Sequence, residues 1–313
     1  MCTAVNIKSS GLFGRTLDLE KSYGEEIVIT PTGHPFGAFH TKYSIIGVAA
    51  VINDTPLYFD GMNERGLCAA ALNYPRFAVY HKEKPDCLNL PSFQLLPYIL
   101  GNCESVDEAW ALLSEVNVTD TPFSEALPPS PLHWIISDKD SSICAEPNGE
   151  GLTLHRNPYD LLTNAPSFDY HSLRVCDYMG LSPRPPKNHL CTDVGLLGYS
   201  RGLGAMGLPG DFSSSSRFIR ALFAREHTQP SSYPVSDFFH IMDTVSLPHG
   251  IVIAENGEAV RTVYTSCADR RNMTYYFTTY GCRRIRGVKL AESSDGSLLR
   301  FSMADSEGLK VLN

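Results

Sequence analysis

A cysteine stands directly behind the initiator methionine in the opening stretch MCTAVN. Initiator methionine is removed when the next residue is small, so we expect Met1 to be lost and Cys2 to begin the mature chain. The residue would then carry both a thiol and a free α-amino group. Such an amino group titrates near ~7.7–8.0 and a thiol near ~8.5, so one residue would supply a nucleophile and a base for acyl transfer.

The segment GRTLD, residues 14–18, adds a cation and an anion to this position. It follows a turn at Gly11, and the resulting hairpin would fold back beside residue 2. The Asp18 carboxylate would accept hydrogen bonds from the α-amino group, and the Arg15 guanidinium would favour the thiolate or bind a substrate carbonyl or anion. A surface ion pair between the two side chains is the simpler alternative.

The elements that must position these residues come as strands in clusters and helices in blocks. Alternating β-branched and aromatic residues predict strands at 3–10, 12–19, 25–33, 44–53, 57–75, 132–147, 151–156, 250–267 and 273–290. Apolar residues spaced by three and four predict helices at 92–102, 105–116, 167–180, 213–227 and 235–245. This order favours an α+β fold with antiparallel sheets over a doubly wound parallel sheet. We expect one domain, residues 1–313.

The bulk composition limits the classes of partner. The 313 residues carry a formal charge of −8, which argues against nucleic-acid and anionic-membrane partners. No stretch approaches the roughly 18 apolar residues of a membrane span, and the N-terminus lacks the segments of a signal peptide. The nine cysteines include no CxxC pair, so we expect no metal site, no cofactor and a reducing, cytoplasmic location.

One motif suggests a different chemistry. Residues 202–207 have the sequence GLGAMG, which matches the GxGxxG pattern of dinucleotide-binding loops. That pattern binds a pyrophosphate only where it joins a strand to a helix N-terminus. Pro209 and Gly210 follow here and would block such a helix, so we expect a glycine-rich loop instead.

Several segments together resemble one known family. They occur along the chain in the family's order: MCTAV, FGRTLD, LYFDGMNERGLCAAALNYP, LHWIISDKDSSICAEP, LLTNAPSFDYH, GLGAMGLPGDFSSSSRF and VYTSC. The family is that of the choloylglycine hydrolases, which includes bile salt hydrolases and penicillin V acylases and belongs to the N-terminal-nucleophile hydrolases. The resemblance covers nearly the whole chain. It implies a four-layer αββα sandwich and a homotetramer.

The resemblance also implies roles for the residues at the N-terminus. Cys2 is similar to the family's nucleophile, which loss of Met1 would free, with its α-amino group as proton acceptor and donor. Arg15 and Asp18 match the arginine and aspartate that stand beside that cysteine in the family.

Three further matches are implied in the same way. Asn164, in LLTNAP, matches the asparagine whose side chain helps to form the oxyanion hole, and Asn73, in ALNYP, matches the position that donates a backbone hydrogen bond to the same oxygen. Arg217, in SSSSRF, matches a second arginine that orders the amine and carboxylate network. Neutral donors suit an oxyanion that exists only in the transition state. Without the resemblance, a turn-forming asparagine or a solvated arginine would be the ordinary interpretation.

The implied reaction is hydrolysis of a linear amide through an acyl-thioester on Cys2. Asn73 favours glycine- or taurine-conjugated bile salts as substrates, because bile-salt-cleaving members resemble this chain there, whereas penicillin V acylases often have a tyrosine that narrows the pocket. The alternatives are a penicillin V acylase, a hydrolase of another N-acyl amide such as an acyl-homoserine lactone, and a non-enzymatic steroid-binding or redox-sensitive protein. A steroid also needs an apolar wall, for which the sequence offers Leu19, Tyr23, Phe36, Phe59 and Ile136.

Overall fold

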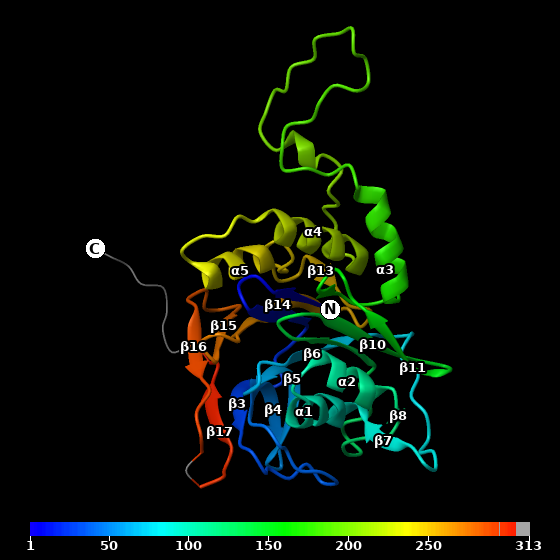
Figure 1. Ribbon diagram of the computed structural model, residues 1–313, viewed down its shortest axis with the longest axis vertical. Helices are drawn as coiled ribbons and strands as arrows, with labels where there is room; N and C mark the ends of the chain where they lie inside the picture. Colours follow the sequence, from blue (N-terminus) through cyan, green and yellow to red (C-terminus); the bar gives the residue numbers. More distant parts are fainter. Residues whose placement is uncertain (294, 305–313) are drawn as a thin grey trace, which may run out of the picture.

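Two large antiparallel sheets lie face to face in the computed structural model, which describes residues 1–293 and 295–304 (Figure 1). The first sheet has the order β12 (Leu161–Leu162), β1 (Cys2–Ile7), β2 (Leu12–Leu19), β14 (Ala259–Asp269), β15 (Thr274–Thr279) and β16 (Arg286–Lys289), with β13 (Val252–Ile253) paired to β14. The second has the order β11 (Gly151–Arg156), β10 (Ser142–Asn148), β9 (Leu132–Ser137), β6 (Cys68–Asn73), β5 (Thr55–Asn63), β4 (Ile45–Ile52), β3 (Glu26–Thr30) and β17 (Leu299–Ser302).

Helices cover the outer face of each sheet. On the first sheet, α4 (Ser214–His227) packs against β1, and α5 (Pro234–Asp243) packs against β14 and β2. On the second, α1 (Ser92–Asn102) and α2 (Val106–Leu113) share an apolar core with β4, β6 and β9. Figure 1 shows the resulting order of helices, sheet, sheet and helices. The predicted α+β fold and four-layer sandwich are therefore confirmed.

Burial on both faces explains the apolar strands of the first sheet. Every residue of β1 except the last is buried, and so is every residue of β2 except Leu19. One face of these strands meets the second sheet and the other meets the helices, so both faces are buried and even the polar residues of β1 and β2 are inside the protein. Polar side chains at such positions must find partners inside the protein.

Two local features differ from the expectations. The helix predicted over 167–180 ends early: α3 spans Phe168–Arg174, and the chain continues as a short 3₁₀ turn, η1 (Val175–Tyr178). A small parallel pair, β7 (Leu88–Pro91) with β8 (Val116–Thr119), stands outside the two antiparallel sheets. Neither feature changes the layers.

The chain between α3 and α4 projects from the body of the molecule (Figure 1). It contains the GLGAMG sequence, which forms the short 3₁₀ turn η2 (Leu203–Ala205) and meets neither a strand nor the N-terminus of a long helix. Gly204 is needed there because a Cβ at this position would lie 1.9 Å from the carbonyl oxygen of Arg184. The prediction of a glycine-rich loop is confirmed.

A single glycine permits the close approach of β2 and β14. A Cβ built on Gly14 would lie 1.9 Å from the carbonyl oxygen of Ser266. We therefore expect Gly14→Ala to lower the free energy of unfolding by about 1–3 kcal/mol, because backbone must move to admit the methyl group. Urea unfolding measures this change. Gly180→Ala is the matched control, since a Cβ there meets nothing within 4 Å, and an equal loss in both variants would contradict the packing argument.

Candidate active site

The β1–β2 hairpin places Arg15 beside the sulfur of Cys2. Its register pairs Cys2 with Leu17 and Ala4 with Arg15, so these four side chains share one face of the sheet. The Arg15 guanidinium donates a hydrogen bond to Cys2 Sγ. Both residues are buried, so the cation and the sulfur meet where little water reaches them.

Arg15 also reaches across to the second sheet. Its Nη1 donates to the carbonyl oxygens of Ala71 on β6, at 2.5 Å, and Phe59 on β5, at 3.2 Å. The Asp60 carboxylate lies 3.8 Å from its Nε. Burial disfavours the charge of Arg15, but the negative groups around it, Cys2 foremost, outweigh burial and raise its pKa above the ordinary value. The residue is therefore a permanent cation against the sulfur.

Asn164 meets the backbone of the same cysteine. It follows β12, which pairs with β1, and its Oδ1 accepts the Cys2 backbone N–H at 2.7 Å and an Nη2 hydrogen bond from Arg217 at 2.7 Å. Two donors on one oxygen fix which end of the amide faces Cys2. Its Nδ2 donates to the carbonyl oxygen of Asn73 at 2.7 Å. The side chain thus joins the first sheet to the second.

Arg217 enters the site from the outer helical layer. It lies in the first turn of α4, whose N-cap Ser213 accepts the N–H of Ser216. Its Nη1 donates to the carbonyl oxygen of Cys2 at 2.5 Å and to the Thr3 hydroxyl at 2.6 Å. Complete burial lowers the pKa of this guanidinium, and four acceptors, counting Asn164 Oδ1 and the Phe212 carbonyl, take up four of its five N–H donors.

Asp18 lies at the site, where its carboxylate binds two hydroxyl groups. It accepts hydrogen bonds from the hydroxyls of Thr262, at 2.6 Å, and Thr16, at 3.1 Å. The backbone of Asp18 pairs with Met1, whose carbonyl accepts the Asp18 N–H at 2.8 Å. In the described part of the chain, the Cys2 N–H goes to Asn164 instead. While Met1 is in place Cys2 has an amide N–H and no free amine, so the expected bond from that amine to the Asp18 carboxylate stays a prediction.

Asn73 presents its backbone to the space beside Cys2. It is the last residue of β6, and the next residue, Tyr74, donates its N–H to Pro131 on the β9 side. Neighbouring residues in a strand point their backbone groups to opposite edges, so Asn73 points away from β9. Its carbonyl meets Asn164 on that edge, and its own N–H lies on the same edge. The other five predicted site residues therefore gather around Cys2.

Sequence reasoning missed a buried acid behind Arg15. Asp60 accepts hydrogen bonds from the hydroxyls of Ser266, at 3.0 Å, Tyr264, at 3.1 Å, and Tyr275. Burial raises the pKa of this carboxyl, against the lowering effect of Arg15 and of these donors. The only signal in the sequence was a charged residue inside the apolar strand LYFDGMN. Its partners lie over 200 residues away along the chain, so no local pattern identified them.

The structure divides the five residues suggested for an apolar wall into core residues and residues that a substrate could contact. Phe36 and Ile136 belong to the core between the second sheet and helices α1 and α2, so they are not wall residues. Leu19 and Phe59 are partly buried against the core that contains Cys2, and Tyr23 is 53% exposed. Only these last three remain available to a substrate.

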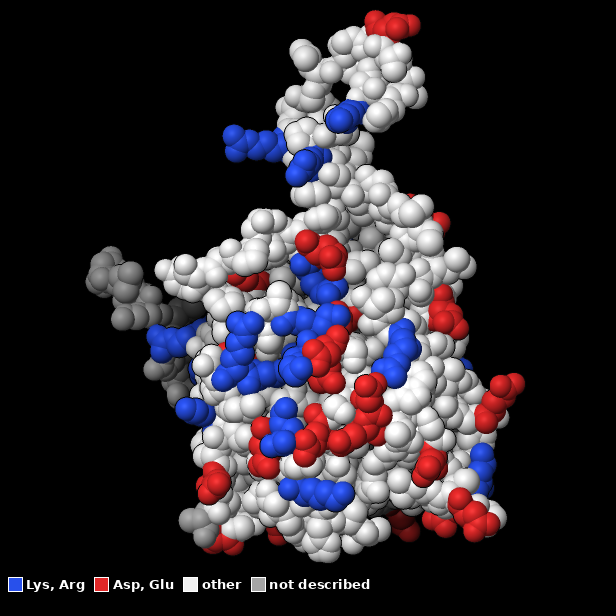
Figure 2. Space-filling model, viewed as in Figure 1, with Lys and Arg blue, Asp and Glu red and all other residues white. Residues whose placement is uncertain are grey.

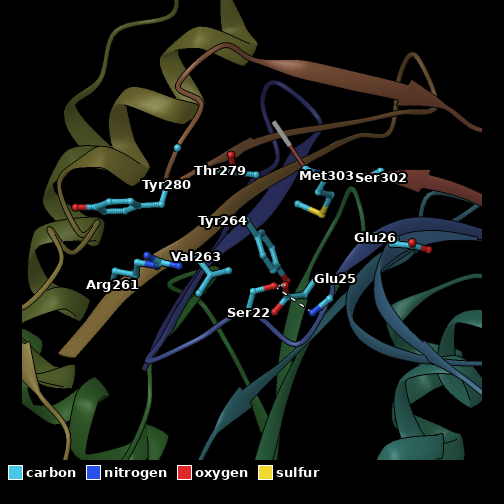
Figure 3. Close-up of a pocket in the computed structure, with 13 residues that line it drawn as sticks. Ser22, Glu25, Glu26, Arg261, Val263, Tyr264, Thr279, Tyr280, Ser302 and Met303 are labelled. Carbon is cyan, nitrogen blue, oxygen red and sulfur yellow. Dashed lines mark hydrogen bonds between the residues drawn. The ribbon is translucent and has the colours of Figure 1, made fainter. Parts of the chain in front are cut away.

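A cavity of about 410 Å³ lies beside the loop that follows β2 (Figure 3). Its lining includes Glu25, Arg261 and Tyr280, and none of the six predicted site residues. Tyr264 also lines it, and the hydroxyl of this tyrosine donates to Asp60 beside Arg15. The cavity therefore adjoins the site through one side chain without being part of it.

Comparison with known proteins identifies the family. Residues 2–306 match the linear amide C–N hydrolases of the choloylglycine hydrolase family. The chain belongs to this family. It is 42% identical to a bile salt hydrolase/transferase from Lactiplantibacillus plantarum over 299 residues. This match covers 93% of this chain and 92% of that protein. The crystal structure of a conjugated bile acid hydrolase from Clostridium perfringens matches with a TM-score of 0.92 and 32% identity over 100% of both chains.

The chain is also similar to a penicillin V acylase. The enzyme from Pectobacterium atrosepticum is 26% identical over 239 residues, which is 70% of this chain and 58% of that protein.

The family assignment makes the chain a hydrolase of linear amide C–N bonds. Across residues 1–293 and 295–304, no helix has the length and apolarity to cross a bilayer, and no cluster of three or more His, Cys, Asp or Glu side chains forms a metal site.

His171 contacts the backbone of Asn164 and makes a contribution to folding stability that depends on pH. Its Nε2 lies 2.8 Å from the carbonyl oxygen of Asn164, and its Nδ1 is buried without a partner. Burial is the main cause that lowers its pKa from 6.5 to about 4. Between these values the unfolded chain binds more protons than the folded one, so this contribution to stability is complete above about pH 6.5 and is lost as the pH falls toward 4.

We expect His171→Gln to weaken the loss of stability on acidification, because an amide can still donate to the Asn164 carbonyl but takes up no proton. The wild type should lose up to about 3 kcal/mol more than the variant between pH 6.5 and 4, at ~1.4 kcal/mol per pKa unit. Urea unfolding at several pH values measures the difference. The contributions of other groups are common to both proteins and cancel, so parallel curves would contradict the assignment.

Proposed function

We propose that this protein hydrolyses the amide bond of glycine- or taurine-conjugated bile salts, with Cys2 as the nucleophile after loss of Met1. The observation that carries the proposal is the position of Cys2 itself. Its sulfur accepts a hydrogen bond from a buried arginine, while its backbone nitrogen bonds to the Asn164 side chain. One residue therefore has both its sulfur and its nitrogen held by groups that suit catalysis.

The chemistry uses the thiol and the amine in turn. The amine takes the thiol proton, and the thiolate attacks the amide carbonyl to form a tetrahedral oxyanion. The carbon–nitrogen bond then breaks as the ammonium returns the proton to the leaving glycine or taurine nitrogen, which leaves an acyl-thioester on Cys2. In the second half the amine takes a proton from water, the resulting hydroxide attacks the thioester, and the bile acid and free thiol are released.

Two neutral donors face the place where the oxyanion forms. Asn164 uses one of the two N–H bonds of its amide for the Asn73 carbonyl, and the other is available to the substrate oxygen. The backbone N–H of Asn73 lies on the same edge of β6 and supplies the second donor. One such donor is typically worth about 2.7–4 kcal/mol of barrier.

The charged residues hold these groups in place. Arg15 favours the thiolate because its cation touches the sulfur. Arg217 binds the Cys2 carbonyl and shares an acceptor with the Cys2 N–H, so it sets the direction of the N-terminus. Asp18 pairs with Met1 through its backbone, and we infer that it contacts the new α-amino group once Met1 is gone.

The choice of bile salts over penicillin V is supported by two observations. Position 73 is an asparagine, and relatives at 42% and 34% identity are bile salt hydrolase/transferases, whereas the related penicillin V acylase is 26% identical over a shorter span. A flat steroid would contact the partly buried Leu19 and Phe59 and the exposed Tyr23.

Assembly into a homo-oligomer is supported by the projecting segment between α3 and α4. Leu190 and Leu197 are each 92% exposed there, and Tyr199 is 82% exposed. Figure 2 shows charged side chains crowded on the body and sparse on this segment. Monomeric proteins rarely expose extended apolar patches, so a second copy would cover them. The tetramer, the cytoplasmic location and the single domain over 1–313 stay predictions.

We expect Cys2→Ser to lose most activity, at least about 10³-fold in kcat, because a hydroxyl ionises far less readily than a thiol. A chain whose Met1 is retained should fold normally and be equally inactive, since its α-amino group is one residue away from the sulfur. Intact mass establishes the start of each chain, and taurine release measures the activity. Normal hydrolysis by the Met1-retaining chain would disprove the role of the α-amino group.

The substrate class is decided by a pair of assays. We expect the wild type to release taurine from taurocholate with a kcat/KM at least about 10-fold above that for penicillin V, because position 73 has an asparagine in place of the larger tyrosine that narrows the pocket of many penicillin V acylases. Amine release from both compounds is measured on the same preparation. The reverse preference would replace the bile salt assignment by a penicillin V acylase, and no release from either would point to another N-acyl amide.

A further inference from the structure

Behind the two asparagines lies a buried histidine that the mechanism above does not use. His133 stands on β9 opposite Leu72 of β6, and its side chain is fully buried. Its Nε2 lies 2.9 Å from the carbonyl oxygen of Thr163, and its Nδ1 lies 3.2 Å from Oε1 of Glu146. Thr163 is the residue directly before Asn164.

The same histidine touches the other half of the oxyanion hole. Its ring stacks on Tyr74, with centroids 4.2 Å apart and planes inclined by 9°. Tyr74 directly follows Asn73, and its N–H is fixed to Pro131 at 2.8 Å. A flat ring pressed against this tyrosine limits how far the end of β6 can move.

Glu146 completes the support from the far side of the Asn164 loop. Its two oxygens accept the N–H of Phe168 at 3.0 and 3.1 Å, where helix α3 begins. The carboxylate and His133 therefore hold the segment 163–168 at both ends. Burial would raise the pKa of Glu146, but the bonds from His133, His155 and the Phe168 N–H outweigh it and lower the pKa to about 2. The group is a carboxylate at every physiological pH.

One hydrogen-bond acceptor faces each ring nitrogen of His133. A carbonyl oxygen and an ionised carboxylate only accept hydrogen bonds, and they lie at Nε2 and Nδ1. The ring therefore links the backbone before Asn164 to the carboxylate that binds the start of α3.

We propose that His133 is a positioning residue for the oxyanion hole, which fixes the chain on both sides of the space between Asn73 and Asn164. The proposal rests on the proposed function, because it assigns a part in stabilising the oxyanion of that reaction. His133 touches neither Cys2 nor the substrate amide. Its effect is geometric: small displacements of a catalytic donor cost about 10²-fold in rate.

Two substitutions separate the two contacts of the ring. An asparagine at 133 places its amide nitrogen near the position of Nδ1 and keeps the bond to Glu146, and a glutamine places its nitrogen near Nε2 and keeps the bond to Thr163. We expect His133→Asn to lower kcat for taurocholate about 10²-fold and His133→Gln to lower it less than about 10-fold. KM should stay within about twofold in both, because the substrate contacts are unchanged.

A second readout distinguishes positioning from a loss of fold. Alkylation of Cys2 by iodoacetamide needs the thiolate but no oxyanion hole, so its rate should be unchanged in both variants. The N-terminal peptide is followed by mass spectrometry, because the exposed Cys87 and Cys176 react as well. Hydrolysis is divided by the folded fraction of each variant, which urea unfolding gives, so any unfolded fraction cancels. His81→Asn is the control, since it removes a ring that lies 3.0 Å from the Asn148 carbonyl outside the site, and no change is expected.

The outcomes keep the two proposals apart. Equal losses in His133→Asn and His133→Gln, a parallel fall in alkylation, or unaltered hydrolysis in both variants would overturn the positioning role while the wild type still cleaves taurocholate. A wild type that cleaves only penicillin V would overturn the bile salt assignment, and the same variants measured on penicillin V would still test His133. A wild type without any amidase activity would end both.

Discussion

A guanidinium buried between two sheets is the interaction on which this site depends. Taking a charge out of water costs several kcal/mol unless partners replace the solvent, and Arg15 has its partners on both sides: a sulfur on β1 and carbonyl oxygens on β5 and β6. Because those groups belong to different sheets, the planar, forked side chain sets their separation at this point. A lysine has no such fork, and its ammonium would leave acceptors unpaired.

The rest of the site extends the same principle of shared partners. Asn164 joins the sheets through its amide, and Arg217 brings the outer helix α4 to the same oxygen that accepts the Cys2 N–H. No element holds the cysteine alone. Since each polar group is buried and bonded, none can move without leaving another unpaired, and such a network stays ordered before any substrate arrives.

The sequence predicted much of this arrangement and missed a definable part of it. Strand and helix patterns are local, so the α+β fold, four of the five helices and the hairpin that carries Arg15 were predicted correctly. Motifs identified Cys2 and the five residues that gather around it, although their catalytic roles stay a proposal. Asp60, His133 and Glu146 were missed, because an isolated polar residue in an apolar strand has no periodicity or spacing that reveals its partner.

By itself, then, the sequence determined most of the strands, the position of the thiol directly after Met1 and which residue types accompany it. The tertiary structure decided which of these residues form hydrogen bonds with one another. Two partners of Cys2 are 162 and 215 residues away along the chain, and the pairing of β12 with β1 and the packing of α4 on β1 bring them within hydrogen-bond distance. The Cys2 N–H shows the difference, because the pairing of β12 with β1 brings its acceptor, the Asn164 side chain, from 162 residues away along the chain. A hydrogen bond forms or fails over differences of tenths of an ångström in distance. The register between strands far apart in the sequence sets these distances, and a local sequence pattern does not.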